Sequence, residues 1–469
     1  MGHLIPTPLS PFAMSARLTR IPMNARLLPL VAALGMLTAQ PSQAEDLMHW
    51  YRAALAYDAS YKSAQSLLSA NEAKADQAVA GLRPSVTVSV GTSRTQSGLI
   101  PDGPSSSSSA YDRDYGTSNA TLSATQPLFR PGNLRTYEAA ELQRSQARLQ
   151  LKTAEQDLMI RVTQAYFDVL ASQDTLTFVR AQKQSVAEQL ASAQRNFEVG
   201  TATITDTREA QARFDLVLAQ EIASENDVRV KQLALDQLVG QATAKPNALS
   251  LSQAFGKLDP ATESEWVSLT LNQQAAVLKA RLDVQVAEKE AAKAKAAQLP
   301  TLDLQASSGA THLMNGSSTS STISGKNITT SLGLALTYPL YAGGALTKRE
   351  LETAALLSKT QADLQATERS ATQSTRTAFY AVQSGLAQVK ALEAAEKSSQ
   401  VALDANKLGY SVGVRINIDV LNSQSQLYDT KAKLSKARYD VVLATLKLKL
   451  AAGVLSVQDL ETVNRLTQP

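Results

Sequence analysis

Two kinds of hydrophobic pattern alternate along the chain. In short segments apolar and polar residues alternate one by one: residues 85–90 read SVTVSV, and residues 302–307 read LDLQAS. This period of two predicts strands with one apolar and one polar face. A Ser- and Gly-rich loop and a return strand follow each of these segments. The pattern therefore predicts two β-hairpins, over residues 84–128 and 300–340.

Long helical segments follow the hairpins. Residues 134–199 contain neither Pro nor Gly, which predicts a helix over 131–199, about 100 Å long at 1.5 Å per residue. Its counterpart is predicted over 344–412. Each ends in a Gly-containing turn and returns as a shorter helix, over 206–239 and 419–452. A seven-residue repeat in the last helix predicts coiled-coil packing; it comprises Leu427, Leu434, Val441 and Leu448.

The second half of the chain repeats the first at an offset of about 213 residues. Thus Asp206 matches Asp419, and Gly240 matches Gly453. A helix also precedes each hairpin, over about 46–81 and 263–298. We therefore expect two copies of one unit, separated by a linker and followed by a tail. The predicted ranges are 45–240 for the first repeat, 241–262 for the linker, 263–453 for the second repeat and 454–469 for the tail.

The hairpins indicate a membrane barrel shared among several chains. Their polar faces carry Ser, Thr, Asp and Gln, so two such sheets cannot enclose an apolar core. Segments of about ten residues with alternating apolar and polar positions are typical of outer-membrane barrels. Four strands cannot close a barrel, because single-chain barrels need at least about eight. Three copies of the chain would supply twelve.

Composition narrows the functional classes. Lys and Arg number 46 and Asp and Glu number 42, but residues 1–44 hold three Arg and no acid. The remaining chain is nearly neutral, which argues against nucleic acid as a partner. An apolar run at 27–37 and the small residues Ser42 and Ala44 predict a secretory signal peptide over 1–44. The run is too short to span a membrane.

Catalytic chemistry finds no support in the sequence. The chain has no Cys, which rules out thiolate metal sites and a Cys nucleophile. His3, His49 and His312 have no spacing that suits a metal site or a catalytic triad. We therefore expect no catalytic residue, no metal, no cofactor and no enzymatic activity.

Several motifs resemble the TolC family of outer-membrane efflux and secretion channels. They are residues 299–304 (LPTLDL), 409–415 (GYSVGVR), 418–421 (IDVL), 437–439 (ARY), 165–170 (AYFDVL) and 204–206 (ITD). The resemblance implies a homotrimer, mainly α with β, in which a twelve-stranded outer-membrane β-barrel with four strands per chain continues as a periplasmic α-helical barrel of coiled-coil hairpins. Residues 241–262 and the tail would form a mixed equatorial belt around it. With no Cys, the chain resembles the unlipidated branch.

The resemblance also implies a function. The protein would be the exit duct of a tripartite export system, for type I protein secretion, multidrug efflux or both. Its partners would be a periplasmic adaptor protein, an inner-membrane ABC or proton-driven transporter, and outer-membrane lipid. The alternative is a periplasmic coiled-coil adaptor or scaffold. Adaptors usually have one helical hairpin, whereas this chain repeats the hairpin twice and joins each copy to a strand pair.

A gate at the periplasmic tip is a further implication. The turns at 199–207 and 412–420 would meet there, and polar links would hold the tunnel closed. The positions that match by motif are Gln189, Thr205, Asp206, Tyr410 and Arg415. Asp206 would accept a hydrogen bond from Tyr410, and Arg415 would reach the Thr205 region of a neighbouring helix pair. The residues alone predict a simpler role for Asp206 and Asp419, at the start of the return helices, and both roles are compatible.

Asp419 is the strongest candidate for the constriction. In the family an Asp at this position lines the narrowest point, so a trimer would carry a ring of three carboxylates that favours cations. Two positions depart from the family pattern. Asn422 stands where a second Asp is common, which predicts weaker cation preference. Lys407 stands where an acid would face Gln189, which predicts that this link is weakened or rewired.

Overall fold

The computed structural model describes residues 46–100, 111–242, 246–247, 258–315 and 324–465. Within these ranges the chain forms two repeats of two helices, two strands, a long helix and its return helix. The first repeat comprises α1 (Leu47–Tyr57), α2 (Ala59–Ala80), β1 (Ser85–Leu99), β2 (Tyr111–Phe129), α3 (Pro131–Glu198) and α4 (Ile204–Val239). The second comprises α5 (Glu263–Gln273), α6 (Ala275–Ala296), β3 (Thr301–Met314), β4 (Gly325–Thr337), α7 (Ala345–Ser411) and α8 (Asn417–Ala451), and α9 (Val457–Arg465) follows. The predicted fold class, mainly helical with a two-fold repeat and four strands, is confirmed. The predicted signal peptide and much of the linker lie outside the described residues.

The four strands form one antiparallel sheet in the order β1-β2-β3-β4. Residues opposite each other in an antiparallel pair share a face, so the even-numbered positions of all four strands lie together. On this face the Val and Leu side chains of the two edge strands are 65 to 79% exposed: Val86, Val88, Val90, Leu332, Leu334 and Leu336. The other face carries mainly Ser, Thr, Asn and Gln. The sheet therefore has an apolar face that a single chain leaves uncovered.

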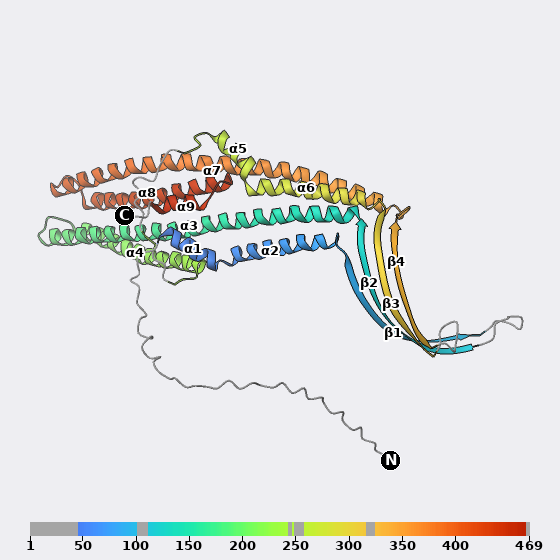
Figure 1. Ribbon diagram of the computed structural model, residues 1–469. Helices are drawn as coiled ribbons and strands as arrows, with labels where there is room; N and C mark the ends of the chain where they lie inside the picture. The colour runs from blue at the N-terminus through green and yellow to red at the C-terminus, as the bar shows by residue number, and fades with distance from the viewer. Residues whose placement is uncertain (1–45, 101–110, 243–245, 248–257, 316–323, 466–469) are drawn as a thin grey trace, which may run out of the picture. The chain divides into compact units, whose positions relative to one another are not determined.

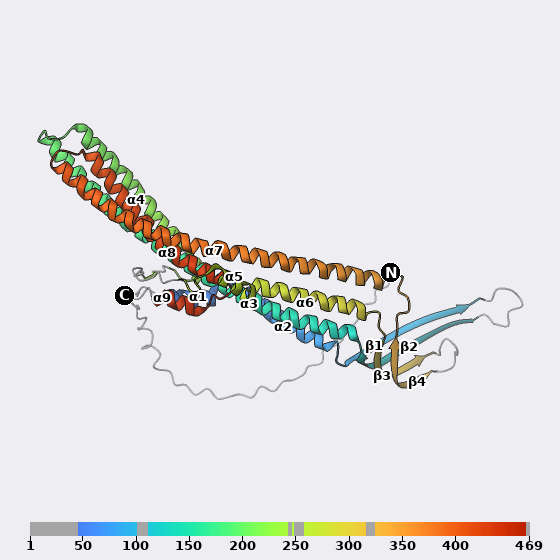
Figure 2. The ribbon, with the colours of Figure 1, turned by 90° about the horizontal axis from the view of Figure 1, so that it is seen from above.

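Four helices run side by side from the sheet in the order α2, α3, α6, α7, as Figure 1 shows. Farther along, α3 pairs with its return helix α4, and α7 pairs with α8. Figure 2 shows the two helical hairpins side by side as far as their turns. The strands and these turns therefore lie at opposite ends of the helices. None of the helices in the described ranges is both long enough and apolar enough to cross a membrane.

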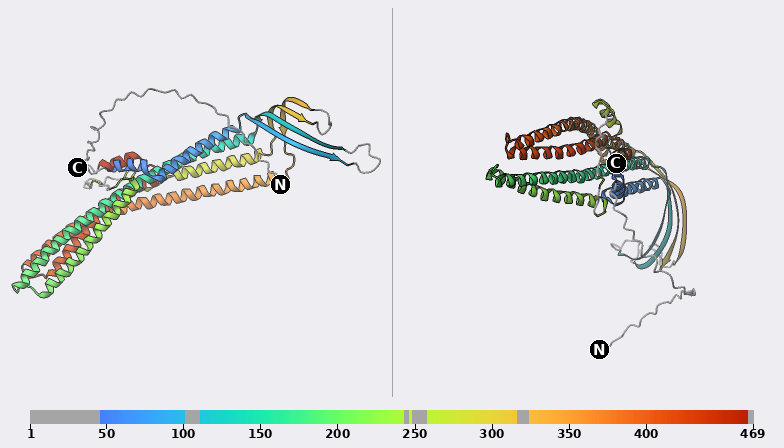
Figure 3. Two further views of the ribbon diagram at one scale, coloured as in Figure 1. Left: turned by 90° about the horizontal axis from the view of Figure 1, so that it is seen from below. Right: turned by 90° about the vertical axis from the view of Figure 1, so that its left-hand side faces the viewer.

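The largest hydrophobic core lies midway along the helices. It joins α1 and α9 to α3, α4 and α8, and Figure 3 shows α1 and α9 next to each other. The Phe167 ring of α3 stacks on the Tyr439 ring of α8, with 5.6 Å between centroids. Tyr166 is fully buried and donates a hydrogen bond to the backbone carbonyl of Asn247 at 2.9 Å. The two repeats are thus bound together at this level by apolar packing.

The helix predicted over 46–81 is in fact two helices, because Asp58 interrupts it. Its carboxylate accepts a hydrogen bond from the backbone N–H of Tyr61 at 2.7 Å and so caps α2. The Arg161 guanidinium bonds the same carboxylate at 2.9 Å and holds the pKa of Asp58 below its ordinary value. The helix predicted over 263–298 is likewise broken, at Gln274. Hydrophobic periodicity continues across both breaks, so the sequence pattern did not reveal them.

An ion pair joins the two repeats where the sheet meets the helices. Arg130, between β2 and α3, donates to both carboxylate oxygens of Asp303 in β3, at 2.8 and 2.6 Å. The Asp303 side chain is almost completely buried, whereas Arg130 is partly exposed. A carboxylate in this position needs its partner, because an unpaired buried charge is costly.

Replacing Arg130 by methionine should lower the free energy of unfolding by about 1 to 3 kcal/mol, since it leaves the Asp303 carboxylate without its charged donor. Arg135→Met is a matched control, because Arg135 pairs with Glu138 on the same helix surface, and such pairs contribute about 0.5 kcal/mol or less. Thermal unfolding in detergent, followed by the helical circular dichroism signal, would measure both. Equal losses would contradict a special role for the Arg130–Asp303 pair.

Candidate functional site at the helical tip

Two turns at the tip close the helical hairpins. Gly200 follows α3 and Gly413 follows α7, each with a backbone φ of +79°. This left-handed conformation suits glycine and ends the long helices. The return helices α4 and α8 begin within a few residues, at Ile204 and Asn417. Both begin two residues earlier than the sequence predicted, so Thr205 and Asn417 lie in the helices rather than in the turns.

Asp206 caps the helix in which it lies. Its carboxylate accepts hydrogen bonds from the backbone N–H of Thr203 at 3.0 Å and from the Thr203 hydroxyl at 2.7 Å. The Asp206 backbone N–H donates to the same hydroxyl at 3.2 Å, which completes a capping box. Thr205 is exposed beside it. The carboxylate is thus occupied within its own chain, and the link from Tyr410 to Asp206 stays a prediction.

Asp419 lies in the first turn of α8, where a carboxylate also favours the helix dipole. Its carboxylate is 3.5 Å from the Arg415 guanidinium, one turn earlier in the chain. The Asp419 side chain is about one-third exposed and Arg415 more than half. Both groups therefore remain accessible at the tip. A contact between Arg415 and the Thr205 region of a neighbouring helix pair stays a prediction.

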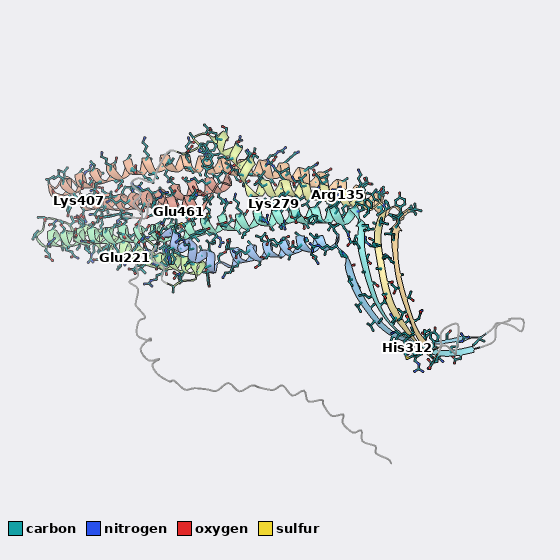
Figure 4. The ribbon with its side chains drawn as sticks, viewed as in Figure 1. Arg135, Glu221, Lys279, His312, Lys407 and Glu461 are labelled. Atoms are coloured by element: carbon teal, nitrogen blue, oxygen red, sulfur yellow. The ribbon has the colours of Figure 1, made fainter. Side chains whose placement is uncertain are left out.

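Gln189 and Lys407 do not contact each other. The Gln189 amide of α3 donates to the side-chain oxygen of Asn417 in α8 at 2.5 Å. Lys407 is exposed on α7, and Figure 4 shows it near the tip, whereas His312 lies on the strands. The structure thus supplies Gln189 with a different partner. Sequence reasoning missed Asn417, since nothing in its motif reveals that it is fully buried.

The remaining predicted residues also bond across the tip. The Tyr410 hydroxyl of α7 accepts a hydrogen bond from the Asn196 amide of α3 at 3.4 Å. The Asn422 side chain of α8 accepts one from Arg213 of α4 at 2.7 Å. Both contacts join the α3–α4 hairpin to the α7–α8 hairpin. Neither Asn196 nor Arg213 was among the residues singled out from the sequence.

Polar contacts continue along α3 and α8 above the tip. The Gln182 amide donates a hydrogen bond to the Ser425 hydroxyl at 3.4 Å, and the Ser185 and Tyr428 hydroxyls are 3.2 Å apart. Farther up, the Asp174 carboxylate accepts hydrogen bonds from Ser435 and, at 2.9 Å, from Tyr439. Tyr439 itself belongs to the large apolar core at the middle of the helices. Toward the tip the interface between the hairpins therefore combines polar contacts with apolar packing, whereas the largest apolar core lies at the middle of the helices.

Charged contacts strengthen each hairpin internally. Glu221 of α4 is buried against α3, where Lys183 and Arg180 both bond its carboxylate. The hydrogen bond from Lys183 is the main reason that the pKa of Glu221 lies below its ordinary value. Figure 4 labels Glu221 among the helices on the tip side. Within the described residues no group of three or more His, Cys, Asp or Glu is arranged to hold a metal ion.

The arrangement of this chain matches known channels. The profile of a family described as outer membrane efflux protein matches residues 50–241 and 266–454, which cover both repeats. The chain belongs to the outer membrane efflux protein family. The resemblance to TolC channels is thereby confirmed, and the protein is placed in the outer membrane. The match to both repeats favours the channel over the periplasmic adaptor or scaffold.

Individual members of the outer membrane efflux protein family agree with this assignment. The chain is 31% identical over 442 residues to outer membrane protein TolC of Vibrio cholerae, covering 94% of this chain and 98% of that protein. It is 34% identical over 354 residues to alkaline protease secretion protein AprF of Pseudomonas aeruginosa, covering 75% and 73%. Among solved structures, VceC of Vibrio cholerae superposes with a TM-score of 0.72 at 22% identity, covering 87% and 96%.

Proposed function

We propose that the protein is the exit duct of a tripartite export system, serving type I protein secretion, multidrug efflux or both. The observation that carries this proposal is the sheet, whose uncovered apolar face stands at one end of the long helices α3 and α7, opposite the turns of the two helical hairpins. Such a sheet suits outer-membrane lipid, and the helices would reach through the periplasm. Its work is transport, with no catalytic step.

The functional unit in this proposal is a homotrimer. Within the described residues β1 pairs with β2 alone and β4 pairs with β3 alone, so the sheet formed by these residues has two unpaired edges. Joining β1 of one chain to β4 of the next would satisfy those edges and close a barrel of twelve strands from three chains. The exposed apolar side chains would then face lipid and the Ser and Thr side chains would face the lumen.

The names of the relatives support a role in export, in which this duct would work with partner proteins. One relative is described as an alkaline protease secretion protein and another as a toluene efflux pump outer membrane protein, which supports export of proteins or small compounds. A periplasmic adaptor and an inner-membrane ABC or proton-driven transporter would supply the energy and select the cargo. The chain has no ATP-binding motif that would let it do so alone.

The gate in this proposal is the tip. Asp419 would line the constriction as a ring of three carboxylates, with Arg415 beside each of them. Asp206, Thr205 and Tyr410 would contribute links, and Asn422 and Lys407 would modify them. A gate held by a few weak polar links opens readily when a partner prefers the open state.

Asp419→Ala should abolish most of the cation preference of the channel. In planar bilayers the mature wild-type protein is expected to show small, long-lived openings that favour cations several-fold. The variant is expected to show openings with a cation-to-anion permeability ratio near one. Asp429→Ala is the control, because Asp429 is an exposed residue of α8 paired with Lys433. If a folded trimer failed to conduct, or if both variants lost selectivity alike, the placement of Asp419 at the constriction would be wrong.

A further inference from the structure

One side chain of α8 holds both helices of the opposite hairpin. Asn417 is fully buried, although it is the first residue of α8 and lies at the tip. Its amide oxygen accepts a hydrogen bond from Gln189 of α3, and its amide nitrogen donates to the backbone carbonyl of Asp206 in α4 at 3.3 Å. When the hairpins part, both of these bonds must break.

The other contacts across the tip are also not ion pairs. The Asn422 amide accepts from Arg213, and the Tyr410 hydroxyl accepts from the Asn196 amide. Ion pairs at the tip lie within a single hairpin, as Arg415–Asp419 and Lys183–Glu221 do. Among the described residues 180–216 and 403–430, no ion pair joins one hairpin to the other. Each of these polar contacts thus has a neutral amide or hydroxyl group on at least one side.

Apolar residues packed between the two hairpins offer a way to detect whether the hairpins have separated. Leu421 of α8 is fully buried in a cluster whose other members come from α3 and α4, including Val186 and Ala210. By contrast Leu403 of α7 is buried against Val420 and Leu427, inside the α7–α8 hairpin. Separation of the hairpins would expose Leu421 and leave Leu403 covered.

We propose that Asn417 is a latch that holds the α7–α8 hairpin against the α3–α4 hairpin in the closed channel. The proposal rests on the proposed gating function and adds a buried, uncharged contact to it. Salt screens exposed charges strongly and buried neutral hydrogen bonds little. The latch therefore keeps the hairpins together at high ionic strength, and water replaces its bonds once the tip has opened.

Thiol labelling of the intact protein tests the latch. The chain has no cysteine, so Leu421→Cys and Leu403→Cys each introduce a single reactive site per chain. Asn417→Ala should raise the labelling rate at position 421 by about ten-fold, which corresponds to the loss of one or two buried hydrogen bonds. The rate at position 403 should stay within about two-fold. Changing the salt from low to high should affect labelling at 421 less than Asn417→Ala does.

Asn406→Ala is the matched control, because Asn406 bonds Ser423 within the α7–α8 hairpin. It should leave labelling at position 421 within about two-fold of the parent. Gln189→Ala removes the α3 partner of Asn417. The double variant with Asn417→Ala should raise the labelling rate at position 421 by less than the sum of the two single effects on a logarithmic scale. The latch is refuted if Asn417→Ala leaves position 421 protected, or exposes positions 421 and 403 equally. Labelling reports on the hairpins whether or not the protein conducts, so failure of the latch and failure of the proposed channel are distinguishable.

Discussion

Gly453→Ala is expected to lower the free energy of unfolding by at least about 3 kcal/mol, and to reduce the yield of folded protein. Gly453 follows the end of α8 with a φ of +75°. A Cβ atom there would lie 2.5 Å from the Cα of Gln274 and 2.6 Å from the carbonyl of Gln273. These are backbone atoms at the junction between α5 and α6, so the clash cannot be relieved by rotating a side chain.

Gly413→Ala isolates the part of this effect that comes from the backbone conformation. Gly413 has a φ of +79°, but no atom lies within 4 Å of the position its Cβ would take. An alanine in the left-handed region costs about 1 to 2 kcal/mol. Chemical unfolding in detergent would compare the two variants. If they lost equal stability, the close approach of α8 to the α5–α6 junction would not matter for folding.

The internal repeat made much of this architecture predictable. Gly240 and Gly453 occupy the same repeat position, and both lie in the left-handed region after a return helix. The order of strands and helices could be predicted because apolar residues recur every two residues in strands and about every 3.6 residues in helices. Each spacing places the apolar side chains on one face of the element. Strand ends were less predictable. β1 continues to Leu99 and β2 begins at Tyr111, so both include residues of the loop predicted between them, since ladder hydrogen bonds depend on the partner backbone rather than on apolar side chains.

The candidate site was only partly accessible to sequence reasoning. Motifs pointed to Asp206, Asp419 and Tyr410 at the tip. Their hydrogen-bond partners, however, depend on how helices far apart in the sequence pack against each other. Gln189 and Asn417 are 228 residues apart. The sequence does not distinguish a buried asparagine from an exposed one, so no periodicity or motif could predict that Asn417 is buried. The same limit applies to the ion pair between Asp58 and Arg161, which forms only because α3 packs beside the start of α2.

Equivalent positions in the repeat can also lie in different surroundings. Phe167 of α3 corresponds to Tyr380 of α7 by the repeat offset. Phe167 is 2% exposed and lies in the core that α1 and α9 complete, whereas Tyr380 is 53% exposed. The Tyr380 hydroxyl donates a hydrogen bond to Glu263 at 2.6 Å on the surface. Sequence similarity between the repeats therefore does not imply equal contributions to stability.

Phe167→Ala should consequently cost about 3 to 5 kcal/mol, the range for deleting a buried aromatic ring that leaves a cavity. It also removes the stacked contact with Tyr439 that connects α3 to α8. Tyr380→Ala, at the equivalent position, should cost about 1 kcal/mol or less. The unfolding midpoints of the two variants, measured in parallel, would decide the point. A similar loss for both would show that assembly of the chains buries Tyr380 as deeply as the fold of one chain buries Phe167.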